Sequence, residues 1–122
     1  MRIVIQHISG HEAGRSESFP LGTVRIGRDE SCDVRLDLHR DLEVSSRHSE
    51  IYLDPARGLR LRDLGSTNGT WLDVDRVEDA PLPSGARIEL GRGGVELRVR
   101  LRRSLREWLT GRDPAKPRAA PV

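Results

Sequence analysis

Turn-forming residues divide this chain into short stretches, and this division limits its fold more than any other feature. Between the turns, apolar and polar residues alternate over a few positions at a time. About nine such stretches recur at intervals of roughly 8–12 residues, which is typical of an all-β sandwich or barrel. Since neither a βαβ spacing nor an internal repeat occurs, we expect one all-β domain.

The expected strands cover most of the chain up to Leu101. They are residues 2–8, 16–21, 23–26, 34–36, 49–53, 59–64, 70–74, 86–90 and 95–101. We expect hairpins around Gly22 and around residues 91–94. Residues 75–85 are expected to be irregular, because Pro81 and Pro83 cannot lie in a central strand.

One stretch near the C-terminus has a helical pattern. Within Arg103–Thr110, the apolar residues Leu105, Trp108 and Leu109 are spaced i, i+3 and i+4, and a glycine follows as a stop signal. We expect Trp108 to dock this helix on the sandwich. Residues 112–122 are rich in proline, alanine and basic residues, so we expect a flexible basic tail there.

Composition bounds the size and class of the protein. With 122 residues, of which 35% are hydrophobic and 33% charged, the chain suits one soluble domain with a modest core. Residues 98–118 carry a charge of +6, so residues 1–97 carry −4 within the formal net charge of +2. The single cysteine, Cys32, rules out an intramolecular disulfide framework. No signal peptide or transmembrane run is recognisable, and a cytoplasmic location is expected.

The stretch from Asp63 to Thr70 carries more polar groups than a tight turn needs. Its Asn68-Gly69 pair is a strong turn signal, because both residues tolerate positive φ. The hydroxyls and carboxamide of residues 66–68 could also meet an extended ligand, and recognition is commonly carried by loops on a β scaffold. By itself, the stretch is compatible with a plain turn or with a binding loop.

Two further loops make the binding interpretation stronger. Gly27-Arg28 and the segment 44–48 each follow or precede an expected strand, as does Ser66-Thr67-Asn68-Gly69. Together the three loops supply a guanidinium, several hydroxyls and a carboxamide. A planar guanidinium matches the oxygens of a phosphate, and hydroxyls can complete the shell around it. The set therefore favours an oxyanion ligand.

In these residues the chain resembles the forkhead-associated (FHA) family of phosphothreonine-binding modules. The family pattern of Gly-Arg, then Ser-x-x-His, then Asn-Gly occurs here in order, and the resemblance extends over residues 2–101. Residues 33–36, 63–70 and 83–91 match the context of these motifs. The resemblance implies an FHA-type β-sandwich of about ten to eleven strands, with the ligand site on loops at one end. We expect the short C-terminal helix in addition.

The resemblance also implies a role for each matching residue. Contacts to the phosphate are implied for Arg28, Ser45, Ser46 and Thr67. Asn68 should hold the ligand backbone beside the phosphothreonine. Roles in the architecture of the site are implied for Gly27, His48 and Gly69, and His48 should brace the loop that carries Ser45.

Ser46 departs from the family pattern, in which an arginine or asparagine often follows the serine. A hydroxyl can still bond a phosphate oxygen, but it brings no charge. Arg47 is the next residue, and it need not face the ligand. We therefore expect a lower affinity than is usual for the family, but not a loss of binding.

Other kinds of site find less support in the sequence. Ser45 and His48 could suggest a nucleophile and its base, but no orienting third group stands at a recognisable position, so no catalytic residue is expected. The four histidines lack metal-ligand spacing with Cys32, and neither a metal nor a cofactor is expected. The basic tail could contact nucleic acid, although charge runs of this size are usually solvated.

The sequence therefore predicts a non-catalytic module that binds phosphothreonine in an extended segment of a partner protein. A kinase acting on the partner is implied, and neither a membrane nor a nucleic acid is expected as the main partner. The expected organisation is an FHA domain over residues 1–102, a short helix over 103–111 and the flexible basic tail over 112–122. The alternative is a phospho-independent interaction or self-association module that uses the same sandwich.

Overall fold

The described residues fold into two β-sheets packed face to face, with one short helix at the end. The structure is a computed structural model and describes residues 1–111 and 115. Its strands are β1 (Arg2–His7), β2 (Ser16–Pro20), β3 (Val24–Gly27), β4 (Val34–Arg35), β5 (Ser49–Asp54), β6 (Gly58–Asp63), β7 (Thr70–Leu72), β8 (Asp75–Val77), β9 (Asp79–Pro81), β10 (Arg87–Leu90) and β11 (Val95–Arg102), and the helix is α1 (Leu105–Thr110). The expected all-β sandwich with a C-terminal helix is confirmed.

One sheet has six strands in the order β2-β1-β11-β10-β7-β8, and the other has five in the order β4-β3-β5-β6-β9. All neighbouring strands with a register are antiparallel except β3 and β4. The alternation read from the sequence places one side of each strand inward. In β1, for example, Ile3, Ile5 and His7 are buried between the sheets. The core is built almost entirely from Ile, Leu and Val, as the low aromatic content requires.

One connection differs from the sequence-based expectation, and a second changes sheet in a way that the sequence did not specify. The expected hairpin around Gly22 is wrong, because β2 pairs with β1 in one sheet whereas β3 pairs with β4 and β5 in the other. The stretch between β6 and β7 also passes from one sheet to the other. Each segment crosses at a turn from the sheet of the preceding strand to the opposite sheet. Turn residues alone do not reveal which sheet the next strand joins. The expected hairpin of β10 and β11 is confirmed.

Residues 75–85 are not irregular throughout, as they were expected to be. They contain β8 and β9, which form the edges of the two sheets. Pro81 ends β9 opposite Arg60, on an edge strand where the missing N–H is tolerated. The prolines therefore exclude a central position in the sheet but not a short edge strand.

Helix α1 does not dock on the sandwich through Trp108, so that prediction is wrong. Leu105, Trp108 and Leu109 are 73%, 66% and 68% exposed. The helix begins two residues later than expected because Ser104 is its N-cap, in a capping box with Glu107. Glu107 also pairs with the N-terminal amine of Met1. Polar contacts thus attach the helix to the domain, while its apolar side faces outward.

The predicted flexible tail lies outside the described residues except at Ala115. Ala115 is buried, and its carbonyl accepts a hydrogen bond of 2.9 Å from the N–H of Leu59. The domain boundaries proposed from the sequence stay a prediction. In the described part of the chain, no helix is long and apolar enough to cross a membrane.

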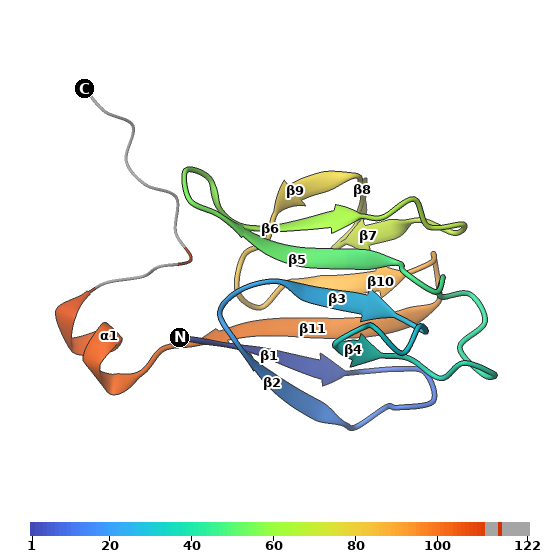
Figure 1. The fold of residues 1–122 in the computed structure, drawn as a ribbon, viewed down its shortest axis with the longest axis horizontal. Coiled ribbons are helices and arrows are strands. Elements are labelled where there is room, and N and C mark those ends of the chain that lie inside the picture. The colour runs from blue at the N-terminus through green and yellow to red at the C-terminus, as the bar shows by residue number, and fades with distance from the viewer. Residues whose placement is uncertain (112–114, 116–122) are drawn as a thin grey trace.

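The fold gathers the loops of interest at one end of the sandwich. The β3–β4, β4–β5, β6–β7 and β10–β11 connections lie together on the right of Figure 1, whereas α1 lies beyond the opposite end. The end with the four connections, opposite α1, contains the three segments singled out from the sequence: Gly27-Arg28, 44–48 and 66–69.

Candidate functional site

Gly27 allows two of the loops to run side by side. Following β3, the N–H of Arg28 donates to the carbonyl of Ser45 over 3.2 Å, and the N–H of Asp29 donates to the carbonyl of Ser46 over 2.9 Å. A Cβ on Gly27 would lie 2.2 Å from the Ser46 carbonyl oxygen, which is far inside van der Waals contact. Only glycine fits at this position, as the resemblance implied for the architecture of the site.

The guanidinium of Arg28 is held from behind by backbone carbonyls. Its Nε donates to the carbonyl of Val44, and its Nη1 donates to the carbonyl of Leu38 over 2.7 Å. Arg28 is half-buried, and a guanidinium carries more N–H donors than these two bonds use. The remaining donors form a fixed, positively charged fork at the end of the sandwich.

His48 braces two loops from inside the domain. Its Nδ1 accepts a 3.0 Å hydrogen bond from the N–H of Ser45, so the ring proton resides on Nε2, which donates to the carbonyl of Gly69 over 2.7 Å. The side chain is fully buried, and this burial lowers the pKa of His48 below its usual value of 6.5. The imidazole is therefore neutral, and it fixes the spacing between the loops of Ser45 and Gly69.

This arrangement prevents His48 from acting as a base for the Ser45 hydroxyl. Both ring nitrogens of His48 are occupied by backbone groups, while Ser45 Oγ accepts a 3.0 Å hydrogen bond from the N–H of Thr67. The Ser45 hydroxyl is thereby oriented with its proton free to donate to a ligand. Its geometry suits a hydrogen-bond donor and not an activated nucleophile.

The hydroxyl-bearing residues beside Ser45 face outward. Ser46 and Thr67 are exposed, and within the described residues neither of their hydroxyls has a hydrogen-bond partner. Asn68 is also exposed, and its Nδ2 donates to the carbonyl of Glu43 over 2.9 Å. This bond holds the carboxamide at the edge of the site and leaves its oxygen available.

Gly69 allows the loop to turn back into β7. Its φ is +84°, in the region that favours glycine, and a Cβ there would meet the side chains of Arg76 and Trp71 at 2.8 and 2.9 Å. Its carbonyl accepts from His48 and from the N–H of Gly91. The structure thus brings together the eight residues singled out from the sequence, whose roles toward a ligand stay predictions.

Asp63 organises the third loop and was not assigned a role from the sequence. One carboxylate oxygen accepts from the hydroxyls of Ser66 and Thr70, and the other accepts from the N–H groups of Gly65 and Ser66. Burial by itself would raise the pKa of Asp63, but these hydrogen bonds outweigh it and lower the pKa below 3.8. An aspartate two residues before a turn glycine is a recognisable signal for such bonding.

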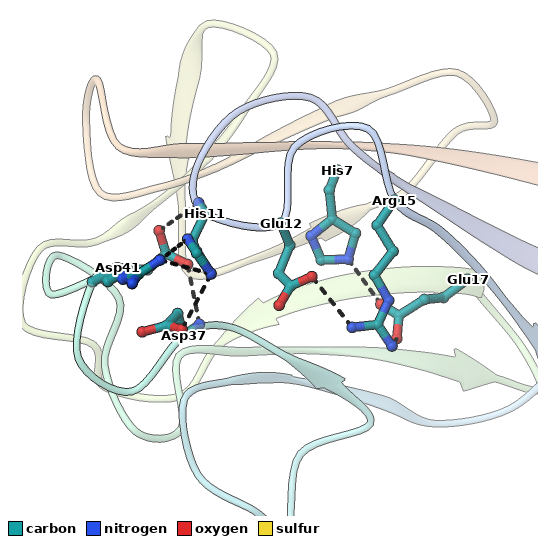
Figure 2. A network of polar contacts seen from close by, with 8 residues as sticks. His7, His11, Glu12, Arg15, Glu17, Asp37 and Asp41 are labelled. Atoms are coloured by element: carbon teal, nitrogen blue, oxygen red, sulfur yellow. Dashed lines mark hydrogen bonds and ion pairs between the residues drawn. The ribbon is translucent and has the colours of Figure 1, made fainter.

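Asp41 supports the loop that holds Arg28, and it too was missed. It is 3% exposed. Its two oxygens accept hydrogen bonds of 3.0 Å from the backbone N–H groups of His11 and Asp37. Figure 2 shows how this carboxylate links the turn after β1 to the segment before Val44, with His11 directed toward Asp37. The carbonyls that orient Arg28 are therefore supported by a buried acid in the same loop, which this acid ties to the turn after β1.

Metal-ligating side chains are not grouped at the site within the described residues. Within the residues that the structure describes, no cluster of three or more His, Cys, Asp or Glu side chains could hold a metal ion. Cys32 lies behind the site with its Sγ 3.4 Å from the Ser46 carbonyl, and burial raises the pKa of its thiol. The guanidinium of Arg28 and the outward hydroxyls can donate hydrogen bonds, which suits an anionic ligand.

Comparison with known proteins identifies the family. A family model for the FHA domain matches residues 24–91, which is more than half of the chain. The chain belongs to the FHA domain family. Its FHA domain is 32% identical over 83 residues to the glycogen accumulation regulator GarA of Mycolicibacterium smegmatis, covering 68% of this chain and 50% of GarA.

Other FHA proteins show the same likeness. The FHA domain-containing protein FhaB of the same organism is 41% identical over 80 residues, covering 62% of this chain and 46% of FhaB. The chain thus spans about half the length of these curated relatives. An FHA domain solved in a study of phosphothreonine-dependent FHA domain interactions is 34% identical, with a TM-score of 0.70 over 85% of this chain and 100% of that chain.

A second solved structure is a complex. It contains the FhaA FHA domain with the intracellular domain of Rv3910, and it is 35% identical to this chain with a TM-score of 0.65. The alignment covers 80% of this chain and 99% of the matched chain. These similarities confirm the family that the three loop motifs indicated.

Proposed function

We propose that this FHA domain binds a phosphothreonine-containing segment of a partner protein and does so without catalysis. The observation that carries the proposal is the fork of Arg28, held by two backbone carbonyls beside the donor hydroxyl of Ser45. A phosphothreonine adds about −1.5 to −2 charges and three acceptor oxygens at neutral pH. A preset guanidinium with flanking hydroxyls matches these acceptors in charge and in number.

In this proposal each outward residue of the site contacts a particular part of the ligand. Arg28 donates to two phosphate oxygens, and the hydroxyls of Ser45, Ser46 and Thr67 complete the shell. Asn68 pairs with the ligand backbone next to the phosphothreonine, which keeps the peptide extended. Because the charge comes from one arginine, the site discriminates against an unphosphorylated threonine chiefly through Arg28.

The similar proteins support this ligand class. One solved FHA domain, 34% identical to this chain, was studied for phosphothreonine-dependent interactions. Another, 35% identical, forms a complex with an intracellular domain. The proposal for this chain is a protein ligand whose threonine a kinase has phosphorylated, in signalling or assembly. The cytoplasmic location expected from the sequence belongs to this proposal and would be tested by fractionation.

A peptide titration tests the proposal. An oriented phosphothreonine peptide library selects a ligand, and calorimetry then compares the selected peptide with its unphosphorylated twin. We expect the phosphate to raise the affinity at least tenfold, because hydrogen bonds to a charged group contribute about 1.5–3 kcal/mol each. Equal binding of both peptides would overturn the proposal in favour of a phospho-independent interaction module.

A further inference from the structure

A second cationic surface lies on the outer face of the six-stranded sheet. In β11, Leu97 and Val99 point into the core, so the alternate residues Arg98, Arg100 and Arg102 point outward. Arg2 on β1 and Arg87 on β10 extend the same face. We refer to these five residues as the arginine stripe. In Figure 1, β11 runs from the end of the sandwich with the loops of Arg28, Ser45 and Asn68 toward α1, and three of the five stripe residues belong to this strand.

Like charges are paired across the strands of this face. Arg2 lies directly opposite Arg102, and Arg87 lies directly opposite Arg98. Like charges at such positions destabilise a sheet unless a counter-charge is supplied. Arg87 reaches one carboxylate, Glu96, at 3.3 Å. Within the described residues, Arg98, Arg100 and Arg102 form no ion pair.

Arg98 also carries an unsatisfied buried donor. Its Nε is buried and has no hydrogen-bond partner among the described residues. Buried donors are nearly always paired in folded proteins, and an unpaired one calls for a physical reason. An anionic group bound at the outer end of the Arg98 side chain would relieve the repulsion from Arg87.

The other sheet shows that this fold does not require unpaired arginines. On its outer face Glu50 lies between Arg25 and Arg62, with ion pairs of 3.7 and 2.9 Å. Arg60 pairs with Asp79 at 2.8 Å. Each of these three arginines meets a carboxylate within the domain. Among the described residues, Arg98, Arg100 and Arg102 of the six-stranded sheet have no such partner.

We propose that the arginine stripe binds an extended, acidic segment of a protein. Alternate residues of a β-strand lie about 6.6–6.8 Å apart, so alternate carboxylates of an extended peptide match Arg98, Arg100 and Arg102 one to one. Arg2 is anchored at the edge of the stripe, where its Nε donates to Ser18 Oγ over 2.7 Å and its Nη2 donates to the Ser18 carbonyl over 3.1 Å, whereas Arg100 and Arg102 are exposed. Guanidinium–carboxylate pairing then supplies the missing acceptors.

The stripe itself lacks the features that a nucleic acid would use. The outward side chains of β1, β2 and β11 include no aromatic ring, and Trp71 of β7, which shares this face of the sheet, lies opposite Glu89 with Arg76 over its ring at 5.3 Å. The stripe lies on a flat sheet, whereas reading a DNA groove takes a helix or ribbon that projects into it. This surface is independent of the phosphothreonine site, so either proposal can fail while the other stands.

The test uses an unphosphorylated synthetic peptide that alternates glutamate with threonine. A twin with glutamine in place of glutamate serves as the uncharged control. Binding is measured by fluorescence anisotropy of a labelled peptide at an ionic strength of about 0.15 M. The variant is Arg100→Gln/Arg102→Gln. Its matched control is Arg25→Gln/Arg57→Gln, which removes the same charge from residues that are each 56% exposed near the other sheet.

We expect the wild type to bind the acidic peptide and to ignore its glutamine twin. The stripe variant should bind at least about fivefold more weakly, and the control should stay within about twofold of the wild type. Equal losses of affinity in both variants would show that only the net charge of the protein matters, and this result would overturn the proposal. The proposal would also be overturned if the wild type did not bind the acidic peptide, or if it bound oligonucleotides more tightly than the peptide. A phosphopeptide titration of the stripe variant should be unchanged.

Discussion

Arg28 and the arginines of the stripe have the same side chain in two opposite settings. The guanidinium of Arg28 is fixed by the carbonyls of Val44 and Leu38 before any ligand arrives. Arg100 and Arg102 are exposed on a strand and have no ion-pair partner within the described residues. The first setting presets a direction in space, whereas the second supplies only charge at a regular spacing.

The comparison shows that an arginine can recognise a ligand by a fixed geometry or by its charge alone. A fixed fork loses little conformational freedom on binding and so favours one geometry of acceptor. Exposed arginines that the fold does not fix, as at Arg100 and Arg102, tolerate many acidic ligands, and their binding should respond strongly to salt. The site at the loops therefore depends on its supports, whereas the stripe depends on the number of its arginines.

The largest effect is expected from removing a support. His48→Ala leaves the N–H of Ser45 and a hydrogen-bond site on the Gly69 carbonyl without their partner. An unsatisfied buried group costs about 1–3 kcal/mol, so the free energy of unfolding should fall by about 2–4 kcal/mol. The affinity for the phosphopeptide should also fall. Chemical denaturation and calorimetry measure both. His39→Ala, at an exposed histidine, should change neither, and lost affinity with unchanged stability would assign His48 to the ligand instead.

Removal of the Arg28 guanidinium should affect ligand affinity more than it affects stability. Arg28→Ala should weaken phosphopeptide binding at least tenfold, because about 1.4 kcal/mol corresponds to a factor of ten and charged hydrogen bonds exceed it. Arg100→Ala removes the same charge from the stripe and should leave this affinity within about twofold. Calorimetric titration of both variants decides. Similar losses for the two would mean that overall charge, and not the fork, attracts the phosphate.

The neutral state of His48 should make stability depend on pH. Since burial lowers the pKa of His48 below 6.5, the unfolded chain binds its proton first as pH falls. The stabilisation is complete above pH 6.5 and declines below it, by at most about 1.4 kcal/mol per pH unit. Denaturation of the wild type and His48→Gln between pH 5 and 8 isolates this contribution. Parallel curves for the two proteins would show that His48 does not titrate in this way.

A smaller effect is expected from the hydroxyl of Thr67. Thr67→Ala removes a neutral donor and leaves Arg28 in place, so the affinity should fall about fivefold, corresponding to about 1 kcal/mol. The salt dependence of binding should not change, whereas Arg28→Ala should reduce it. Thr23→Ala, at an exposed threonine outside the loops, is the control. If Thr67→Ala weakened binding as much as Arg28→Ala, the assumption that Arg28 contributes more to binding than the Thr67 hydroxyl would be wrong.

The smallest effect is expected at the helix. Because Trp108 is 66% exposed, Trp108→Ala should change the free energy of unfolding by no more than about 0.5 kcal/mol, as is usual for surface positions. Glu107→Ala removes the capping box and the contact with the Met1 amine, and it should cost more. Denaturant titration compares them. A loss of several kcal/mol for Trp108→Ala would show that the ring packs on the domain.

The strands and the loop motifs could be predicted from the sequence because their signals are local. Alternation and turn residues located most strands, and the motifs around Arg28, Ser45 and Asn68 indicated the family. The sheet to which a strand belongs is not local information. Hence the segments on either side of Gly22 were expected to pair, although β2 and β3 lie in different sheets.

The supports of the site could not be predicted for a related reason. Arg28 is oriented by the carbonyls of Val44 and Leu38, and every residue type carries a carbonyl, so no side chain marks these positions. Asp41 acts across the domain on the turn at His11, which only the fold brings near. For Trp108, the helical period showed which side is apolar but not whether anything covers it.

The most direct test of the fixed fork is a titration of wild type and Arg28→Lys with the selected phosphothreonine peptide and its unphosphorylated twin. Lysine keeps the charge but cannot bond both carbonyls and still present a planar pair of donors. We predict that the wild type prefers the phosphorylated peptide at least tenfold, and that Arg28→Lys loses at least about tenfold of that affinity. Retention of wild-type affinity by Arg28→Lys, or equal binding of both peptides by the wild type, would contradict the account.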